Sequence, residues 1–204
     1  MDGLLIVMSG FSGAGKGTLM KRLMSDYEDY AFSVSMTTRA PREGEVDGKD
    51  YFFVSKETFE KAIEEGKLVE YACYCDNYYG TPYDYVNKQL KAGKNVILDI
   101  EVQGALQIKE KFPDSLMIYV LPPSVDTLLQ RLHSRGTETD EVIAKRIAQA
   151  KKEVAFIDKY EYLVINDDLD TAVKEMHDMI MSARYAVSRR KDMIEEISGQ
   201  LKNI

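Results

Sequence analysis

Residues 4–19 read LLIVMSGFSGAGKGTL, an apolar run followed directly by a glycine-rich segment. Leu4–Met8 has the continuous hydrophobicity expected of a parallel strand that is covered on both faces. Leu19 and Leu23 lie four residues apart after the glycines, which predicts a helix with one apolar face. The stretch therefore predicts a strand, a glycine loop and a helix in immediate succession.

The loop carries most of a phosphate-binding motif. Gly10, Gly15 and Lys16 fit the pattern G-x-x-x-x-G-K-[ST], in which backbone N–H groups surround a phosphate chain and the lysine reaches its terminal phosphates. Position 17, where the motif has a hydroxyl for magnesium, is Gly17, and the first hydroxyl comes one place later at Thr18. The predicted triphosphate site consists of Gly10, Phe11, Ser12, Gly13, Ala14, Gly15, Lys16, Gly17 and Thr18.

Size and charge exclude several classes of protein. The chain has 204 residues, a length that fits one domain. Its net charge of −7 argues against a general nucleic-acid binder, because such proteins usually have a basic surface. Asp2 stands where a signal peptide would be basic, and no apolar run is long enough for a membrane span. Cys73 and Cys75 are expected on one face of a strand rather than in a metal site. We expect a cytoplasmic protein without nucleic-acid or membrane partners, and the oligomeric state is left open.

Strand and helix patterns alternate over most of the chain. Further buried strands are predicted at 96–100, 116–121 and 162–165. Helices are predicted at 82–92, 102–111, 124–135, 139–159 and from about 169, and the tail after 189 is amphipathic enough for another. This order predicts an α/β fold with a parallel sheet flanked by helices. Residues 30–80 break the alternation with short strand-like runs and one helix, which indicates a small, mostly antiparallel insertion.

The ends of two predicted helices carry capping signals. Thr81 before Pro82 suits an N-cap followed by proline at the first helical position, and Gly93 suits the end of that helix. Ser124 is an N-cap candidate for the helix predicted at 124–135, with Gly136 as its C-terminal stop.

The insertion contains a candidate for a second anion site. Arg39 and Arg42 flank Pro41 on a segment that proline and glycine keep out of a regular helix. Two guanidinium groups on an ordered loop suit a phosphate, and Tyr51 and Ser35 could complete its contacts. The alternative is that these arginines are simply solvated.

Several segments in this order resemble the guanylate kinase family. They are SMTTRAPREGEVDGKDYFF (35–53), LVEYACY (68–74), NYYGTP (77–82), ILDIEVQGA (97–105), QRLHSRGTETDEVIAKR (130–146) and INDDLDTA (165–172). The resemblance implies the reaction ATP + GMP ⇌ ADP + GDP with Mg²⁺. It also implies one domain with three parts: a core (1–34, 83–125 and 151–204), a GMP-binding part (35–82) and a helical lid (126–150).

The resemblance assigns a guanine-reading acid to Glu70. Guanine presents two donors on its Watson–Crick edge, and one carboxylate can accept from both, whereas adenine would leave the acid unpaired. Thr81 matches the hydroxyl residue near the base, in competition with its capping role. The implied GMP-binding residues are Ser35, Arg39, Arg42, Tyr51, Glu70, Tyr79, Thr81 and Asp99. Asp99 ends a buried strand and is also the candidate for an indirect magnesium contact through water.

The predicted lid supplies further cations. Arg131 and Arg135 are four apart on a predicted helix and share a face, and Arg146 lies on the next helix. The resemblance makes them, with Lys16 and Arg39, the catalytic residues that stabilise charge on the transferring phosphoryl group. Asn166 matches the region near adenine, although a strand-end turn would explain it as well.

Two other functions stay open at this stage. One is a catalytically inactive guanylate-kinase-like module that binds protein partners, against which the intact Lys16 loop and lid arginines argue. The other is a kinase for a different monophosphate, against which Glu70 with Thr81 argues.

Overall fold

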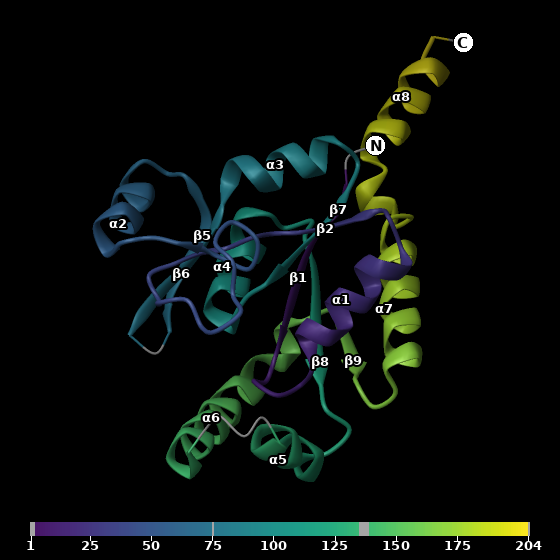
Figure 1. The fold of residues 1–204 in the computed structure, drawn as a ribbon. Helices are drawn as coiled ribbons and strands as arrows, with labels where there is room; N and C mark the ends of the chain where they lie inside the picture. The colour runs from purple at the N-terminus through teal and green to yellow at the C-terminus, as the bar shows by residue number, and fades with distance from the viewer. Residues whose placement is uncertain (1–2, 75, 135–138, 204) are drawn as a thin grey trace.

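The core of the molecule is a five-stranded sheet in the order β2-β7-β1-β8-β9, with every neighbouring pair parallel (Figure 1). The computed structural model describes residues 3–74, 76–134 and 139–203. The strands are β1 (Leu5–Gly10), β2 (Tyr30–Phe32), β7 (Asn95–Asp99), β8 (Leu116–Leu121) and β9 (Tyr162–Ile165). The predicted parallel α/β core is confirmed, and the four predicted strands lie at or close to their expected positions.

Helices cover both faces of this sheet because alternate strand residues point to opposite sides. On one face, α1 (Lys16–Asp26) and α7 (Leu169–Ala183) pack on Ile6, Met8, Ile118 and their neighbours. On the other face, α3 (Tyr83–Lys91) and α4 (Val102–Lys111) pack on Val7 and its neighbours. The continuous apolar run of β1 is therefore explained, since its side chains are buried on both sides.

A second, four-stranded sheet has the order β4-β3-β6-β5 and carries α2 (Lys56–Glu64). Its strands are β3 (Met36–Thr37), β4 (Phe52–Phe53), β5 (Leu68–Tyr74) and β6 (Asn77–Pro82). β6 pairs antiparallel with β3 and β5, whereas β3 and β4 are parallel. The predicted, mostly antiparallel insertion is confirmed, but it does not include the first residues of the range 30–80: β2 joins the core sheet, and β3 joins the second sheet.

The predicted lid consists of α5 (Val125–Ser134) and α6 (Asp140–Glu153), followed by the 3-10 helix η1 (Val154–Lys159). Ser124 Oγ accepts a hydrogen bond from the Thr127 N–H at 3.0 Å, as expected of an N-cap. The helix predicted over 139–159 is thus α-helical only as far as Glu153. Gly136, the proposed stop of α5, lies outside the described residues.

One capping prediction is wrong. Thr81 lies in β6, Pro82 occupies the N-cap of α3, and the Thr81 hydroxyl donates to the Glu70 carboxylate at 2.7 Å instead of capping the helix. A buried carboxylate is the stronger acceptor, and this explains why the hydroxyl turns away from the helix end. Gly93 follows α3 with a φ of 80°, so the predicted glycine stop is confirmed.

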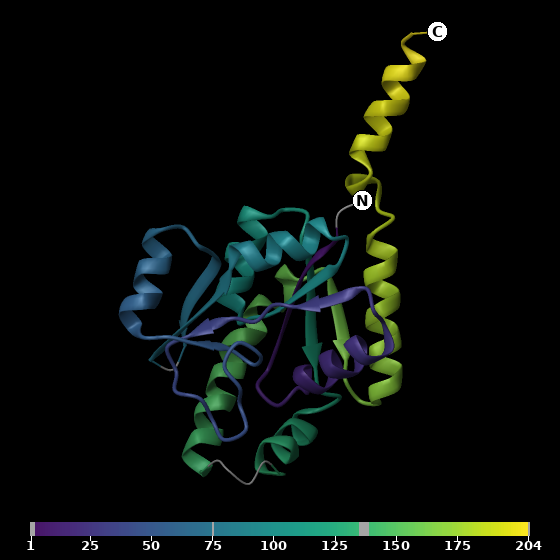
Figure 2. The same cartoon turned by 45° about the horizontal axis from the view of Figure 1, so that its top comes forward.

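The C-terminal part continues through η2 (Val187–Arg189) into α8 (Lys191–Leu201), which projects away from the body in Figure 2. The helix predicted for the tail is confirmed. Within the described ranges, no helix combines the length and hydrophobicity needed to cross a membrane.

Candidate active site

The glycine loop after β1 is tightly enclosed by its neighbours. A Cβ added at Gly10 would lie 2.3 Å from the Val120 carbonyl oxygen, and one at Gly15 would lie 2.3 Å from Asn166 Nδ2. Gly15 also has a φ of 90°, in the left-handed region that favours glycine. The loop can therefore wind back over the end of the sheet and lead into the N-terminus of α1, where backbone N–H groups attract anions.

Lys16 lies at the first position of α1 with its ammonium group over the loop. Nζ donates to the Gly10 carbonyl oxygen at 2.7 Å and lies 3.8 Å from Asp99 Oδ1. Burial raises the pKa of the Asp99 carboxyl, and the charge of Lys16 opposes that shift. The lysine therefore connects the loop to the end of the neighbouring strand β7.

A single pocket extends from this loop to the second sheet, and it gathers most of the predicted residues. Those that line it are Gly10, Ser12, Lys16, Ser35, Arg39, Arg42, Tyr51, Glu70, Tyr79, Asp99 and Arg146. The loop end contributes cations and backbone donors, while the sheet end contributes Glu70 among partly apolar neighbours. The pocket can thus accept phosphates at one end and a polar ring at the other.

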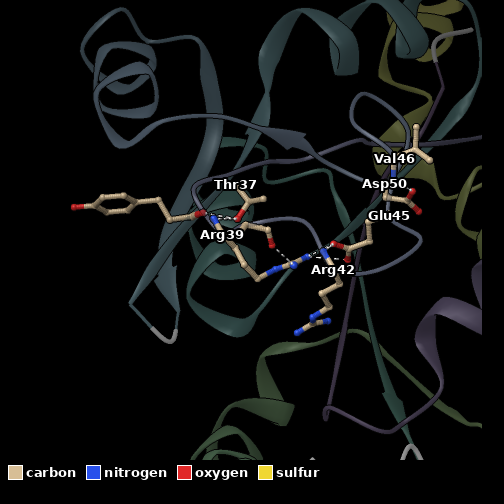
Figure 3. Close-up of polar contacts among 8 residues, drawn as sticks. Thr37, Arg39, Arg42, Glu45, Val46 and Asp50 are labelled. Carbon is tan, nitrogen blue, oxygen red and sulfur yellow. Dashed lines mark hydrogen bonds and ion pairs between the residues drawn. The ribbon is translucent and has the colours of Figure 1, made fainter. Parts of the chain in front are cut away.

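Arg39 is oriented by a carboxylate and by aromatic rings. Its Nη2 donates to both oxygens of Glu45, at 2.8 and 2.9 Å, and its guanidinium lies 5.3 Å from the ring centre of Tyr51. The bonds from Arg39 lower the pKa of Glu45, so this partner stays charged. Figure 3 shows the Arg42 side chain extending away from this pair, while its backbone N–H donates to Glu45 at 2.7 Å.

The backbone of the segment that carries these arginines is also hydrogen-bonded to the segment's own acidic side chains. The Val46 N–H donates to Asp50 Oδ2 at 2.8 Å (Figure 3). The Phe53 N–H donates to Asp47 Oδ1 at 2.9 Å. Hydrogen bonds within the segment therefore hold its backbone, and the Arg39 side chain is paired inside it, whereas the Arg42 side chain is exposed.

Glu70 is buried at the sheet end of the pocket, with 3% of its surface exposed. Burial raises its pKa to about 7, although the hydrogen bond from Thr81 lowers it. Its Oε2 lies so close to α4 that a Cβ added at Gly104 would be 2.5 Å away. Three hydrogen bonds tie the same helix to β5: Gln107 donates to the Tyr71 carbonyl at 2.9 Å and accepts from the Tyr71 N–H at 3.4 Å, and Lys111 donates to the Val69 carbonyl at 2.8 Å. The carboxylate is thus held rigidly between strand and helix.

The lid arginines take two different positions. Arg146 lines the pocket and donates to Ser12 Oγ in the loop. Arg131 instead donates to the carbonyls of Ala14 at 3.3 Å and Asn166 at 2.9 Å, and Asn166 Nδ2 also donates to Ala14 at 2.8 Å. Arg131 and Asn166 therefore both hold the loop at the Ala14 carbonyl. Arg135 lies outside the described residues.

Three further polar side chains line the pocket without having been predicted: Ser9, Glu101 and Glu153. Ser9 directly precedes the loop, and Glu101 follows the end of β7 and caps α4 by accepting from the Gly104 N–H at 2.7 Å. Ser9 is adjacent to Gly10 in the sequence and Glu101 is two residues after Asp99, so closeness to predicted site residues could have identified both. Glu153 ends a long helix far along the chain, and no local pattern distinguishes it from the other charged residues of α6.

The positions that depart from the loop motif are accessible. A Cβ added at Gly17 would meet no atom within 4 Å, and Thr18 is exposed. Phe11, the remaining bulky loop residue, is half-buried and meets the Tyr119 ring edge-on at a centroid distance of 5.7 Å.

The guanylate kinase family model matches residues 3–183, which include both sheets and the whole pocket. The chain belongs to the guanylate kinase family. Among curated relatives, guanylate kinase of Caldanaerobacter subterraneus is 50% identical over 196 residues, covering 96% of this chain and 95% of the relative. Guanylate kinase of Lactiplantibacillus plantarum is 49% identical, covering 99% and 98%.

A solved structure of guanylate kinase from Anaplasma phagocytophilum superposes with a TM-score of 0.77 at 28% identity. It covers 92% of this chain and 89% of that chain. The guanylate kinase architecture is therefore shared over both sheets and not only over the phosphate-binding loop.

Proposed function

We propose that this protein catalyses phosphoryl transfer from ATP to GMP, giving ADP and GDP, in purine nucleotide metabolism. The observation that carries the proposal is one pocket containing the Lys16 loop at one end and the Glu70–Thr81 pair at the other, with Arg39 and Arg42 beside it. The relatives of nearly equal length bear the same function in their names. Nothing observed favours an inactive interaction module.

In the proposed mechanism the protein positions two phosphates and stabilises the charge between them. The loop N–H groups and Lys16 bind the β- and γ-phosphates of ATP, while Arg39 and Arg42 bind the phosphate of GMP. That phosphate has a second pKa near ~6 and is largely dianionic at neutral pH, so no general base is needed. Arg146 reaches the loop and is proposed to stabilise the transferring phosphoryl group, a role also proposed for Arg135.

The base is proposed to bind at Glu70. Its carboxylate accepts from the N1–H and 2-amino groups of guanine, while Thr81 keeps it oriented at 2.7 Å. Ser35, Tyr51 and Tyr79 complete the GMP side of the pocket. Arg131 and Asn166 are proposed to act at the ATP side by holding the loop at Ala14.

Magnesium is the expected companion of ATP. Among the described residues, no three His, Cys, Asp or Glu side chains are grouped closely enough to hold an ion by themselves. The donors fit an ion held mainly by ATP oxygens and water, with Asp99 accepting from a water ligand. The bound ion would neutralise charge on the β- and γ-phosphates.

The three-part organisation, with core, GMP-binding part (35–82) and lid (126–150), is proposed on the same basis. The second sheet and α6 both contribute to the pocket from outside the core, and α6 does so with Arg146. We also propose a cytoplasmic location, which the free thiol of Cys73 suits.

The proposed function is tested by measuring ADP release with GMP, AMP, CMP and UMP as acceptors. We expect turnover with GMP and at least about 10-fold lower kcat/KM with AMP, because adenine leaves the buried acid unpaired. Absence of turnover with every acceptor would support the interaction module. Comparable turnover with AMP would refute the role of Glu70.

The raised pKa of Glu70 predicts a pH dependence of GMP use. The charged carboxylate accepts both guanine donors, so kcat/KM for GMP should rise as pH increases through the pKa of about 7. Between about pH 6 and pH 8 the ionised fraction, and hence kcat/KM, should increase about 10-fold. Steady-state kinetics of the wild type and Glu70→Gln over this pH range check the prediction. The variant lacks the carboxyl that titrates near pH 7, so its profile should follow only the ionisation of the GMP phosphate, whose second pKa is near ~6. An identical profile in both proteins would contradict it.

Gly17→Ser should restore a direct magnesium ligand without disturbing the loop. The added side chain enters open space, so stability should change by less than about 0.5 kcal/mol. The Mg²⁺ concentration for half-maximal activity should fall by up to about 10-fold, since a serine hydroxyl at this position can bind the ion. Gly17→Ala is the matched control, and an equal response of both variants would show that the hydroxyl has no such role.

A further inference from the structure

The lid and the core meet at the side chain of Phe11. Its ring packs against the core cluster of buried side chains that includes Met8, Ile118 and Val120. It also packs against a separate lid cluster formed by Leu128, Leu132 and Ile143, against which Ile147 packs as well. Within the described part of the chain, Phe11 is the one side chain shared by these two clusters.

The lid cluster draws on both lid helices. Leu128 and Leu132 lie four residues apart on one face of α5, and Ile143 comes from α6, so Phe11 packs against a cluster that joins the two helices. A Cβ added at Gly13 would lie 3.0 Å from Leu128 and 3.1 Å from Leu132, so α5 rests directly on the loop. The apolar packing thus joins the phosphate loop to both helices.

Tyr119 provides a second link between the same elements. Its ring meets Phe11 edge-on, and its hydroxyl lies 3.5 Å from Glu153 Oε2 at the C-terminal end of α6. Gln149, one turn earlier, donates to the other oxygen of Glu153 at 3.1 Å. Helix α6 is therefore linked to the lid cluster that Phe11 packs against through Ile143, and to Tyr119 at its end through Glu153.

Between these two contacts lies Arg146, whose guanidinium donates to Ser12 in the loop. Where this arginine reaches depends on the rotation and height of α6 relative to the loop. We propose that Phe11 is a positioning residue: its ring, packed between Tyr119 and the lid cluster, sets α6 so that Arg146 reaches the phosphates bound by the loop. This inference rests on the proposed function only for the identity of the acceptor, since the bound triphosphate is common to any reaction of this loop.

A double-mutant cycle between Phe11 and Arg146 tests the proposal. Phe11→Ala, Arg146→Ala and the double variant are compared with the wild type in kcat with GMP and in Kd for a non-hydrolysable ATP analogue, measured by calorimetry without GMP. We expect Phe11→Ala to lower kcat and to weaken analogue binding, each by about 10-fold, because misplacing a charged group costs rate and affinity. In the Arg146→Ala background the same change should cost less than about 2-fold.

Four further variants separate positioning from stability. Phe11→Leu keeps an apolar side chain in the contact and should stay within about 3-fold of the wild type, because volume-conserving apolar substitutions are tolerated best. Ile143→Ala shortens the α6 member of the lid cluster without altering the loop, and Ile147→Ala shortens the α6 side chain packed against that cluster; both should reproduce the coupling to Arg146. Val142→Ala, on the exposed side of α6, should leave both measurements unchanged. Thermal unfolding fixes a working temperature at which every variant is folded.

The outcomes are distinct. Additive effects of Phe11→Ala and Arg146→Ala in both measurements would overturn the proposal and leave Phe11 with ordinary packing. Additivity with Ile147→Ala would overturn it equally, should Phe11→Ala fail to fold. A wild type inactive toward GMP would refute the proposed acceptor, while the cycle in analogue binding would still decide the role of Phe11.

Discussion

Lys16→Ala is expected to lower kcat by about 10²- to 10³-fold, with a smaller effect on the KM for GMP. The ammonium group lies 2.7 Å from the Gly10 carbonyl oxygen, at the position where the loop presents its N–H groups to a phosphate. Its charge acts on the phosphate oxygens whose negative charge is redistributed during transfer. Coupled measurement of ADP release at saturating GMP gives the result directly.

Two controls make this result specific. Lys21→Ala removes an exposed lysine from the same helix and should leave kcat unchanged. Lys16→Ala combined with Asp99→Asn removes the carboxylate that Lys16 approaches at 3.8 Å. Recovery of activity in the double variant would show that the loss came from an uncompensated buried acid, in contradiction to the phosphate-binding role.

Glu70→Gln is expected to lower kcat/KM for GMP by about 10- to 100-fold, with little change in the KM for ATP. The amide has nearly the same shape and can still accept from Thr81. However, it offers guanine only one acceptor and points a donor at the other guanine donor. Because the group is buried, water cannot compensate for the mismatch.

The substrate series sharpens this expectation. Inosine monophosphate keeps N1–H but lacks the 2-amino group, so the wild type should prefer GMP to it, and the preference should be largely lost in Glu70→Gln. Glu64→Gln, an exposed residue at the end of α2, is the matched control and should behave as the wild type. An unchanged GMP preference in Glu70→Gln would show that another group reads the base.

The sequence predicted best those features that depend on neighbouring residues. The strand–loop–helix order around Lys16 follows from hydrophobic runs and glycine positions, and both appear in the structure. The same holds for β8, whose short apolar run predicts a buried strand that the structure confirms. Arg39 and Arg42 were found because they lie close together on one irregular segment, and both line the pocket.

Features set by distant partners were not predictable in this way. That β2 joins the core sheet depends on its pairing with β7, some sixty residues later in the chain. Thr81 was given two competing roles, near the base and as a helix cap, because no local pattern shows that Glu70 offers its hydroxyl a better acceptor. The catalytic role of Arg131 stays a prediction, and no local pattern predicted its contacts with Ala14 and Asn166, which lie far from it in the sequence.

The hydrogen bonds between α4 and β5 have a consequence for how this enzyme family can diversify. Glu70, which we propose reads the base, lies on the strand that Gln107 and Lys111 of the core helix α4 hold, whereas Arg39, which we propose binds the phosphate, is held by Glu45 within its own loop. The proposed contacts with the base and with the phosphate thus depend on separate parts of the structure. Mutations that change the contacts with the base can therefore accumulate without disrupting the contacts with the phosphate, so new acceptor preferences can evolve while phosphate binding is retained.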